Sequence, residues 1–339
     1  MENDNPVIDF TIITGFLGAG KTTLLRHLLT DRHGKNLAVI VNEFGEIGID
    51  GALVLDDSEN RMLEMNNGCV CCEVRDDLVT AITTLLDKRE KGLIQFGHIV
   101  METTGIARPG PIVETLHSVK IKQLVKLNGI ITVVDAFHLT SQLDEFSEAQ
   151  EQIGVADFII LNKTDLVDSD QLQQIEQRIT AMNAQAQIAT ASECKVNIKD
   201  LFTLANNAMT RLNAGFIGKL SPHQETNGHS ISLHKQNQHL DNIHSLSIEI
   251  VEPLQKELLL DWFSFFIMRY EERLLRFKGI LNFKDHNNRT IFQGIHSLFD
   301  ATLDREWLDD EQRVTRIVFI GRDLPEDEIR SGIKSCIAN

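Results

Sequence analysis

The chain has 339 residues, of which 42% are hydrophobic and 24% are charged, and its formal net charge is −16 at pH 7. This length is about twice that of a typical domain, so we expect two globular domains. The acidic balance argues against nucleic-acid binding, which relies on basic contacts to phosphates. No apolar run reaches the roughly 18 residues of a membrane span. Residues 1–9 lack a secretory signal, so we expect a cytoplasmic protein with reduced thiols.

The first part of the chain alternates between short apolar runs and helical patterns. Strands are expected at residues 10–14, 37–41, 98–101, 129–134 and 158–161, because each run is apolar and bounded by polar residues or glycine. Helical spacing is found at residues 24–29 and 76–88. This alternation predicts an α/β fold with a mostly parallel, doubly wound sheet.

The pattern changes near residue 215, which we take as the end of a first domain of residues 1–215. Residues 216–242 are rich in Asn, Gln, Ser and His and are expected to form a linker. Five of the twelve histidines lie within residues 223–244, but no pair has a tight metal-ligand spacing, so a polar linker is favoured over a metal-collecting loop. Residues 243–339 are expected to form a smaller α+β domain. Its strands are expected at 245–251, 281–283, 290–299 and 313–320, and its helices at 254–275 and 326–337.

A phosphate-binding loop is predicted at residues 15–22, which fit the pattern G-x-x-x-x-G-K-[ST]. The match follows an expected strand and precedes an expected helix, as this motif requires. Glycines let backbone N–H groups turn toward phosphate oxygens, and the helix N-terminus favours anions. Lys21 is expected to contact the β- and γ-phosphates, and Thr22 to ligate Mg²⁺. The candidate nucleotide-binding residues of this segment are Gly15, Gly18, Ala19, Gly20, Lys21, Thr22 and Thr23.

Glu102 follows the expected strand at residues 98–101 and precedes a Thr-Thr-Gly sequence that ends at Gly105. A carboxylate at such a strand end can hold Mg²⁺ or orient the attacking water. Gly105 is in a position to sense the γ-phosphate through its backbone N–H. Lys21, Glu102 and Gly105 are therefore the catalytic candidates.

A guanine-binding motif is predicted at Asn162, Lys163 and Asp165, directly after the strand at 158–161. The Asp165 carboxylate can accept two hydrogen bonds from guanine, whereas adenine does not offer this donor pair. A second contact to the base is expected from the loop at residues 190–192. This motif argues against the alternative of a P-loop kinase or ATPase with a structural zinc.

Three of the five cysteines, Cys69, Cys71 and Cys72, lie within four residues. Thiolates favour zinc or cobalt over Mg²⁺. A functional metal site is preferred over a structural zinc site and over redox or inert thiols, because the usual redox spacing is C-x-x-C. Two or three thiolates leave the site incomplete, so Glu46, a histidine, water or a second protomer must supply the rest. Cys194 and Cys336 are isolated and are expected to be packing or surface residues.

These motifs together resemble the CobW family of metal-associated P-loop GTPases. The resemblance rests on residues 14–23, 42–46, 67–72, 102–105, 134–138 and 162–165, and on residues 244–321 for the C-terminal domain. It implies GTP hydrolysis coupled to the binding and delivery of zinc or cobalt to a client protein. It also implies Cys69, Cys71 and Cys72 as ligands and Glu46 as a residue of a nucleotide-responsive switch.

Two positions depart from the pattern of the family. Val41 stands where some members carry an acidic residue, and Arg108-Pro109 stands where many carry an aspartate, so neither role transfers. No arginine finger is evident, which predicts slow intrinsic hydrolysis. A metal-storing or metal-sensing GTP-binding regulator is the alternative function, and a homo-oligomer is possible.

Overall fold

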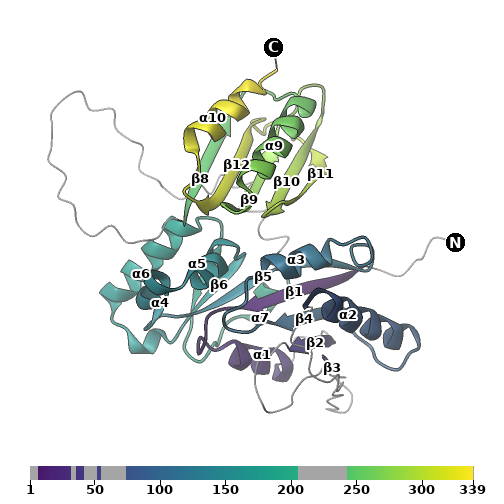
Figure 1. Ribbon diagram of the computed structural model, residues 1–339, viewed down its shortest axis with the longest axis vertical. Helices are drawn as coiled ribbons and strands as arrows, with labels where there is room; N and C mark the ends of the chain where they lie inside the picture. The colour runs from purple at the N-terminus through teal and green to yellow at the C-terminus, as the bar shows by residue number, and fades with distance from the viewer. Residues whose placement is uncertain (1–6, 32–35, 42–51, 55–73, 205–242, 339) are drawn as a thin grey trace.

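The computed structural model describes residues 7–31, 36–41, 52–54, 74–204 and 243–338. Within these ranges the chain forms two domains, each built on one sheet (Figure 1). The predicted boundary at residue 215 and the predicted linker at 216–242 lie outside the described residues and stay predictions. Among the described residues, no helix has both the length and the apolar character to span a bilayer.

The N-terminal domain contains a seven-stranded sheet in the order β3-β2-β4-β1-β5-β6-β7. Six of its strands run parallel, and β3 pairs antiparallel with β2 at one edge. The central strands are mostly apolar and are buried along almost their whole length, because both faces of the sheet are covered. The strands are β1 Ile8–Thr14, β2 Leu37–Val41, β3 Ala52–Val54, β4 His98–Glu102, β5 Val125–Asp135, β6 Phe158–Asn162 and β7 Gln187–Thr190.

Helices cover both faces of this sheet, which confirms the predicted doubly wound α/β fold. On one face lie α2 Val74–Glu90, α3 Gly110–Leu116, α4 Leu139–Glu145, α5 Ser147–Gly154 and α6 Ser169–Met182. On the other face lie α1 Lys21–Thr30 and α7 Ile198–Leu201. The carboxyl ends of β1, β4, β5 and β6 meet at one edge, which is where ligands bind in such sheets.

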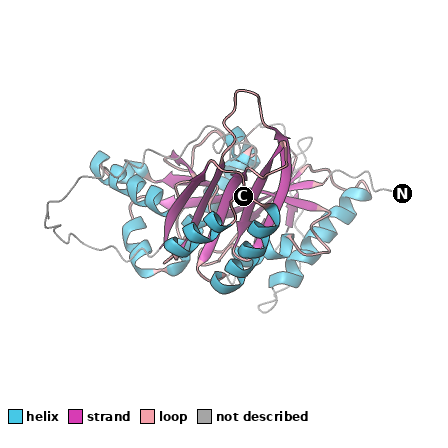
Figure 2. Cartoon of the chain, turned by 90° about the horizontal axis from the view of Figure 1, so that it is seen from above, coloured by secondary structure: helices cyan, strands magenta, loops and turns pink. Residues whose placement is uncertain are grey.

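The C-terminal domain is an antiparallel sheet in the order β11-β10-β9-β12-β8 with two helices packed on it (Figure 2). The strands are β8 Ile243–Ile250, β9 Leu274–Leu281, β10 Asn288–Ile295, β11 Leu298–Glu306 and β12 Thr315–Arg322. The helices are α9 Lys256–Tyr270 and α10 Glu326–Ser335. A cluster of aromatic rings centred on Phe263 joins α9 to the sheet, with Phe277 and Phe292 each 4.6 Å from it between centroids.

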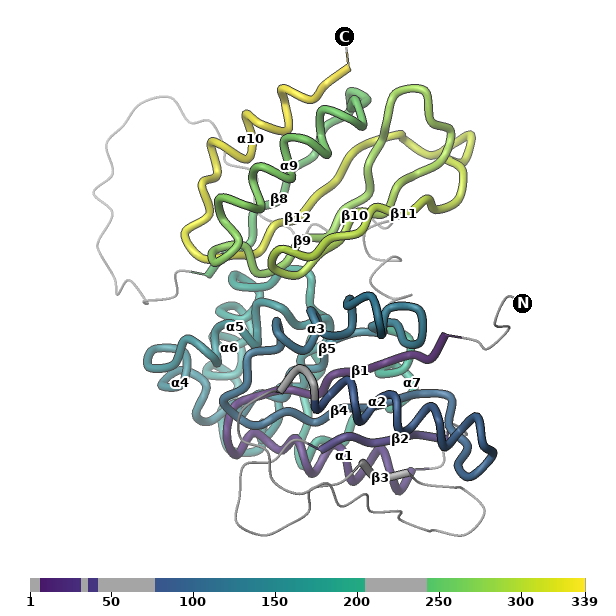
Figure 3. Tube along the Cα trace, turned by 45° about the vertical axis from the view of Figure 1, so that its right-hand side comes forward, coloured from purple at the N-terminus to yellow at the C-terminus, as the bar shows by residue number. Residues whose placement is uncertain are grey.

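The other side of the C-terminal sheet packs on the N-terminal domain, above α3, α5 and α6 (Figure 3). Ile243, Leu275 and Ile320 belong to the same buried apolar cluster as Ile153 of α5. One hydrophobic core is therefore continuous between the two domains.

Two expectations for the C-terminal domain were wrong. The helix predicted at 254–275 ends at Tyr270, and Leu274 already starts β9. The strand predicted at 290–299 is a hairpin of β10 and β11, because the chain reverses at His296, whose φ is 51°. In both places only two or three polar residues interrupt the apolar run, namely Glu271 to Arg273 and His296-Ser297, and we read each as part of a continuing element. The order is therefore β-α-β-β-β-β-α, with one strand more than predicted.

Candidate functional site

The predicted phosphate loop connects the end of β1 to the first residue of α1. Gly15 and Gly20 have φ values of 141° and 112°, which side chains other than glycine rarely allow. A Cβ at Gly20 would also lie 2.6 Å from the Asn162 side-chain nitrogen. Both glycines are therefore required by the backbone path, as the motif predicts. The N-terminus of α1 points into the loop and provides a favourable field for phosphate.

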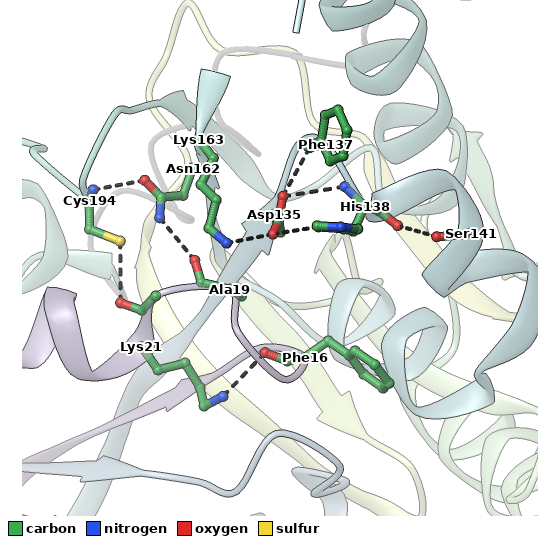
Figure 4. Close-up of polar contacts among 11 residues, drawn as sticks. Phe16, Ala19, Lys21, Asp135, Phe137, His138, Ser141, Asn162, Lys163 and Cys194 are labelled. Carbon is green, nitrogen blue, oxygen red and sulfur yellow. Dashed lines mark hydrogen bonds and ion pairs between the residues drawn. The ribbon is translucent and has the colours of Figure 1, made fainter. Parts of the chain in front are cut away.

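Lys21 is buried and its ammonium group is turned back into the loop. Its Nζ donates to the carbonyl oxygen of Gly15 at 2.8 Å. It also donates to the carbonyl oxygen of Phe16 at 3.3 Å (Figure 4). The positive charge is thus held inside the curve of backbone that the motif assigns to the β- and γ-phosphates. This is the position from which Lys21 can neutralise them.

Thr22 and Glu102, the two predicted Mg²⁺ ligands, lie next to each other. The Thr22 hydroxyl donates to Glu102 Oε1 at 2.7 Å, and the Glu102 side chain is buried. Hydroxyl and carboxylate oxygens are the ligands that a hard cation prefers, so the pair fits Mg²⁺. When bound, this ion neutralises charge on the β- and γ-phosphates.

The turn that follows Glu102 lies against the phosphate loop. Thr103 is anchored to β1, because its N–H donates to the Ile13 carbonyl at 2.9 Å and its hydroxyl to Thr14 Oγ1 at 3.0 Å. A Cβ at Gly105 would lie 2.8 Å from the backbone nitrogen of Leu17. Gly105 therefore lies against the phosphate loop, and the contact of its N–H with a γ-phosphate stays a prediction.

Asn162 connects the phosphate loop to the loop after β7. Its side-chain nitrogen donates to the Ala19 carbonyl at 2.9 Å, and its oxygen accepts the Cys194 N–H at 2.8 Å (Figure 4). Asn162 is 3% exposed, so these contacts fix its amide. This residue thus aligns the predicted guanine pocket with the phosphate site.

Lys163 and Asp135 form an ion pair beside this pocket, with 2.7 Å between Nζ and Oδ2. Asp135 also accepts from the ring of His138 at 3.0 Å (Figure 4). Burial alone would raise the pKa of Asp135, but the hydrogen bonds from Lys163 and His138 outweigh it and hold the pKa below its usual value. Asp135 therefore stays ionised and keeps the Lys163 side chain in place.

Asp165 accepts a hydrogen bond from the Ser192 hydroxyl at 2.6 Å. The structure thus brings the two predicted base-contacting segments together at an exposed edge. Ser192 belongs to the loop at residues 190–192, from which a second contact to the base is expected from the sequence. Asp135 was noted in the sequence only through the family pattern, although an aspartate at the end of a buried strand is itself a sign of a site residue.

Cys194 and Cys336 are both buried, so of the two expected settings, packing or surface, the structure shows packing. Burial raises the pKa of the Cys194 thiol to about 11, so the thiol stays protonated. Its Sγ contacts the Gly20 carbonyl at 3.3 Å and closes the base of the phosphate loop. Arg108 binds Glu148 at 3.1 Å and Glu151 at 3.2 Å, so its side chain is directed to α5.

The predicted transition-metal ligands Glu46, Cys69, Cys71 and Cys72 lie outside the described residues. Within the described part of the chain, no cluster of three or more His, Cys, Asp or Glu side chains could hold a metal ion. The assignment of these four residues to a metal therefore stays a prediction.

Two family models together match most of the chain. The model described as CobW/HypB/UreG, nucleotide-binding domain, matches residues 9–190. The model for the C-terminal domain of the cobalamin synthesis protein CobW matches residues 243–337.

Relatives match over nearly the full length of the chain. The zinc chaperone YjiA of Escherichia coli is 38% identical over 96% of this chain and 98% of its own. The zinc-regulated GTPase metalloprotein activator 1 of Schizosaccharomyces pombe is 33% identical over 94% of this chain and 83% of its own. The crystal structure of Zn(II)-bound YjiA GTPase from E. coli superimposes with a TM-score of 0.73 at 34% identity and covers 98% of this chain and 100% of that one. Because the site, both family models and these relatives agree, the chain belongs to the CobW family of P-loop GTPases.

Proposed function

We propose that this protein is a GTP-hydrolysing metallochaperone that binds zinc and delivers it to a client metalloprotein. Support for zinc comes from the relatives, which are named zinc chaperones or a zinc-regulated GTPase metalloprotein activator. Cobalt is the second metal that the thiolates of Cys69, Cys71 and Cys72 suit.

The observation that carries this proposal is where the chain leaves the sheet after β2. Val41, the last residue of β2, pairs directly with Glu102 of β4. Residues 42–51, which contain Glu46, therefore start beside the carboxylate that fits Mg²⁺. They lead into β3, whose Ala52 pairs with Ile40 of β2, and the residues with the three cysteines follow β3 and precede α2, which begins at Val74. In this proposal, a change at the γ-phosphate acts on the start of residues 42–51, and β3 connects these residues to the cysteines.

In the proposed cycle, the protein residues around the phosphates set the state of that segment. Lys21 and the backbone N–H groups of the phosphate loop bind GTP, and the N–H of Gly105 faces the γ-phosphate. Bound GTP orders the segment that follows Val41 and brings the thiolates together for zinc. Hydrolysis to GDP relaxes it, so that zinc passes to the client, as in other switches that the γ-phosphate controls.

Linkage makes this proposal testable, because nucleotide and zinc must change each other's affinity by the same factor. Zinc affinity is measured by competition with a chromogenic chelator in the presence of GDP, a non-hydrolysable GTP analogue or no nucleotide. We expect the GTP analogue to tighten zinc binding about 5-fold or more. Cobalt titrated in the same way decides between the two metals.

Cys71→Ser is expected to remove this nucleotide-dependent change. Cys336→Ser is the matched control, because it also removes one thiol, but from the buried end of α10. Equal zinc affinity in all three nucleotide states would contradict the coupling. A transfer assay to a zinc-free metalloenzyme then tests delivery: nucleotide-dependent binding without faster transfer would favour the storage or sensing regulator.

A further inference from the structure

Helix α5 contacts the turn that contains Gly105 through a buried amide side chain. Gln152 of α5 is 1% exposed. Its side-chain nitrogen donates to the Gly105 carbonyl at 3.2 Å and to the Ala107 carbonyl at 2.9 Å. Both donors of one amide group are thus used on the turn that lies against the phosphate loop.

Gln152 is itself held in place from the other side. Its backbone carbonyl accepts a hydrogen bond of 2.6 Å from the Thr132 hydroxyl, which belongs to the central strand β5. At its first residue the turn is bound to β1 through Thr103. The turn is therefore fixed at Thr103 by the sheet and at Gly105 to Ala107 by Gln152.

We propose that Gln152 is a positioning residue for GTP turnover, which holds the Gly105 turn at the distance at which its N–H meets the γ-phosphate. This inference rests on the GTPase part of the proposed function and is independent of zinc delivery. Gln152 does not touch nucleotide: it acts through the turn. GDP has no γ-phosphate, so the effect of Gln152 is specific to GTP.

We therefore expect GTP hydrolysis to slow in variants whose side chain at position 152 cannot donate these two hydrogen bonds. Gln152→Leu removes both hydrogen bonds and leaves the buried Gly105 carbonyl and the half-buried Ala107 carbonyl without this partner. Gln152→Glu keeps the size of the side chain but presents acceptor oxygens to two carbonyl oxygens. Because a displacement of about 1 Å in a reacting geometry can cost roughly 100-fold, we expect kcat for GTP to fall about 10- to 100-fold in both variants. The dissociation constant for GDP is expected to stay within about 2-fold, since GDP makes no contact that depends on the turn.

The matched control is Gln150→Leu on the same helix. Gln150 is also buried, and its side-chain nitrogen donates to the Leu143 carbonyl at 2.7 Å, away from the turn. A loss of helix stability alone would affect the Gln150 and Gln152 variants alike. A loss of the positioned turn affects only the Gln152 variants.

The experiment measures steady-state GTP hydrolysis and the affinities for GDP and a GTP analogue, for the full-length wild type and the three variants. A lower kcat and a lower preference for the GTP analogue over GDP, seen only for Gln152→Leu and Gln152→Glu, support the proposal. The proposal is overturned if either Gln152 variant keeps kcat and nucleotide preference within 2-fold of the wild-type values. It is also overturned if Gln150→Leu lowers kcat as much as the Gln152 variants do. If neither Gln152 variant folds, hydrogen exchange of residues 147–154 in the wild type decides: slower exchange with the GTP analogue than with GDP supports the proposal, and equal rates overturn it. Failure of the wild type to hydrolyse GTP would instead contradict the proposed function.

Discussion

At the residue scale, Asp135 shows how one buried carboxylate organises the nucleotide site. It accepts the backbone N–H groups of Phe137 at 3.0 Å and His138 at 3.3 Å, and so shapes the start of α4. The same carboxylate holds the ammonium group of Lys163. The structure thus assigns Asp135 a supporting position beside the predicted guanine pocket that its neighbours in sequence do not disclose.

Asp135→Asn is expected to weaken binding of GTP and GDP equally, by roughly 5- to 10-fold, because Lys163 loses a charged partner. Titration with fluorescent derivatives of both nucleotides measures this. Asp144→Asn is the control, since it removes a carboxylate that pairs with Arg178 on the neighbouring surface. A change in the ratio of GTP to GDP affinity in Asp135→Asn would contradict this assignment, because neither residue is placed at the γ-phosphate.

At the scale of elements, α5 is in contact with both the Gly105 turn and the C-terminal domain. Glu151, which precedes Gln152, is buried and binds Arg108 at 3.2 Å. Its other oxygen lies 3.6 Å from the imidazole nitrogen of His296, at the tip of the β10–β11 hairpin. The His296 ring also lies against Gly110, where a Cβ would be 2.7 Å from it. The β10–β11 hairpin of the C-terminal domain thus contacts Gly110, which follows the Gly105 turn in the chain.

We predict that hydrogen exchange at the β10–β11 hairpin differs between the GDP-bound and GTP-analogue-bound protein. His296→Ala is expected to abolish this difference while GTP hydrolysis continues, because the contact to Glu151 and Gly110 is lost. His286→Ala, in the connection at the other end of β10, is expected to leave the difference intact. Identical exchange in the two nucleotide states of the wild type would contradict a connection through this hairpin.

Strands with a continuous apolar run and helices with apolar residues at helical spacing were predictable from the sequence. The motifs at the strand ends of the nucleotide site were predictable as well. The phosphate loop and the guanine motif are short and continuous, so one segment contains the whole signal. The contacts of Gln152 with Gly105 and Ala107 join residues 45 and more apart along the chain, and no local pattern indicates them. The hairpin at His296 was missed for a related reason: its two-residue turn, His296-Ser297, has no Gly, Pro or Asn, and apolar residues resume directly after it.

At the scale of the whole molecule, a buried group of charges joins the two domains. Asp157, which precedes β6, binds both Arg276 and Lys278 of β9, and all three side chains are buried. Burial alone would raise the pKa of Asp157, but the two cations outweigh it and hold the pKa below its ordinary value. Asp157 therefore remains ionised in the folded protein.

This ion group predicts a pH-dependent stability. The folded-state pKa of Asp157 lies below its unfolded value of 3.8. Its contribution to the free energy of unfolding is therefore complete above pH 3.8, and it is lost as the pH falls from there through the folded-state pKa. At pH 7, Asp157→Asn leaves two buried cations without their partner, and we expect it to lower the free energy of unfolding by about 3–5 kcal/mol. The difference from wild type should shrink below pH 3.8.

Urea denaturation followed by tryptophan fluorescence measures this effect, because Trp262 and Trp307 both lie in the C-terminal domain. Asp87→Asn is the control: it breaks an exposed pair with Lys91, which is expected to contribute at most about 0.5 kcal/mol. A loss at pH 7 no greater than in this control would show that the ion group does not stabilise the docked domain.

The apolar cluster shared by Ile153, Leu275 and Ile320 means that the regions matched by the two family models bury part of one common surface, although the C-terminal domain also has a core of its own around Phe263. If the chain were cut between the two domains, each fragment would expose to water an apolar surface that is buried in the intact protein. Each half would then gain a tendency to associate with whatever covers that face, including the other half.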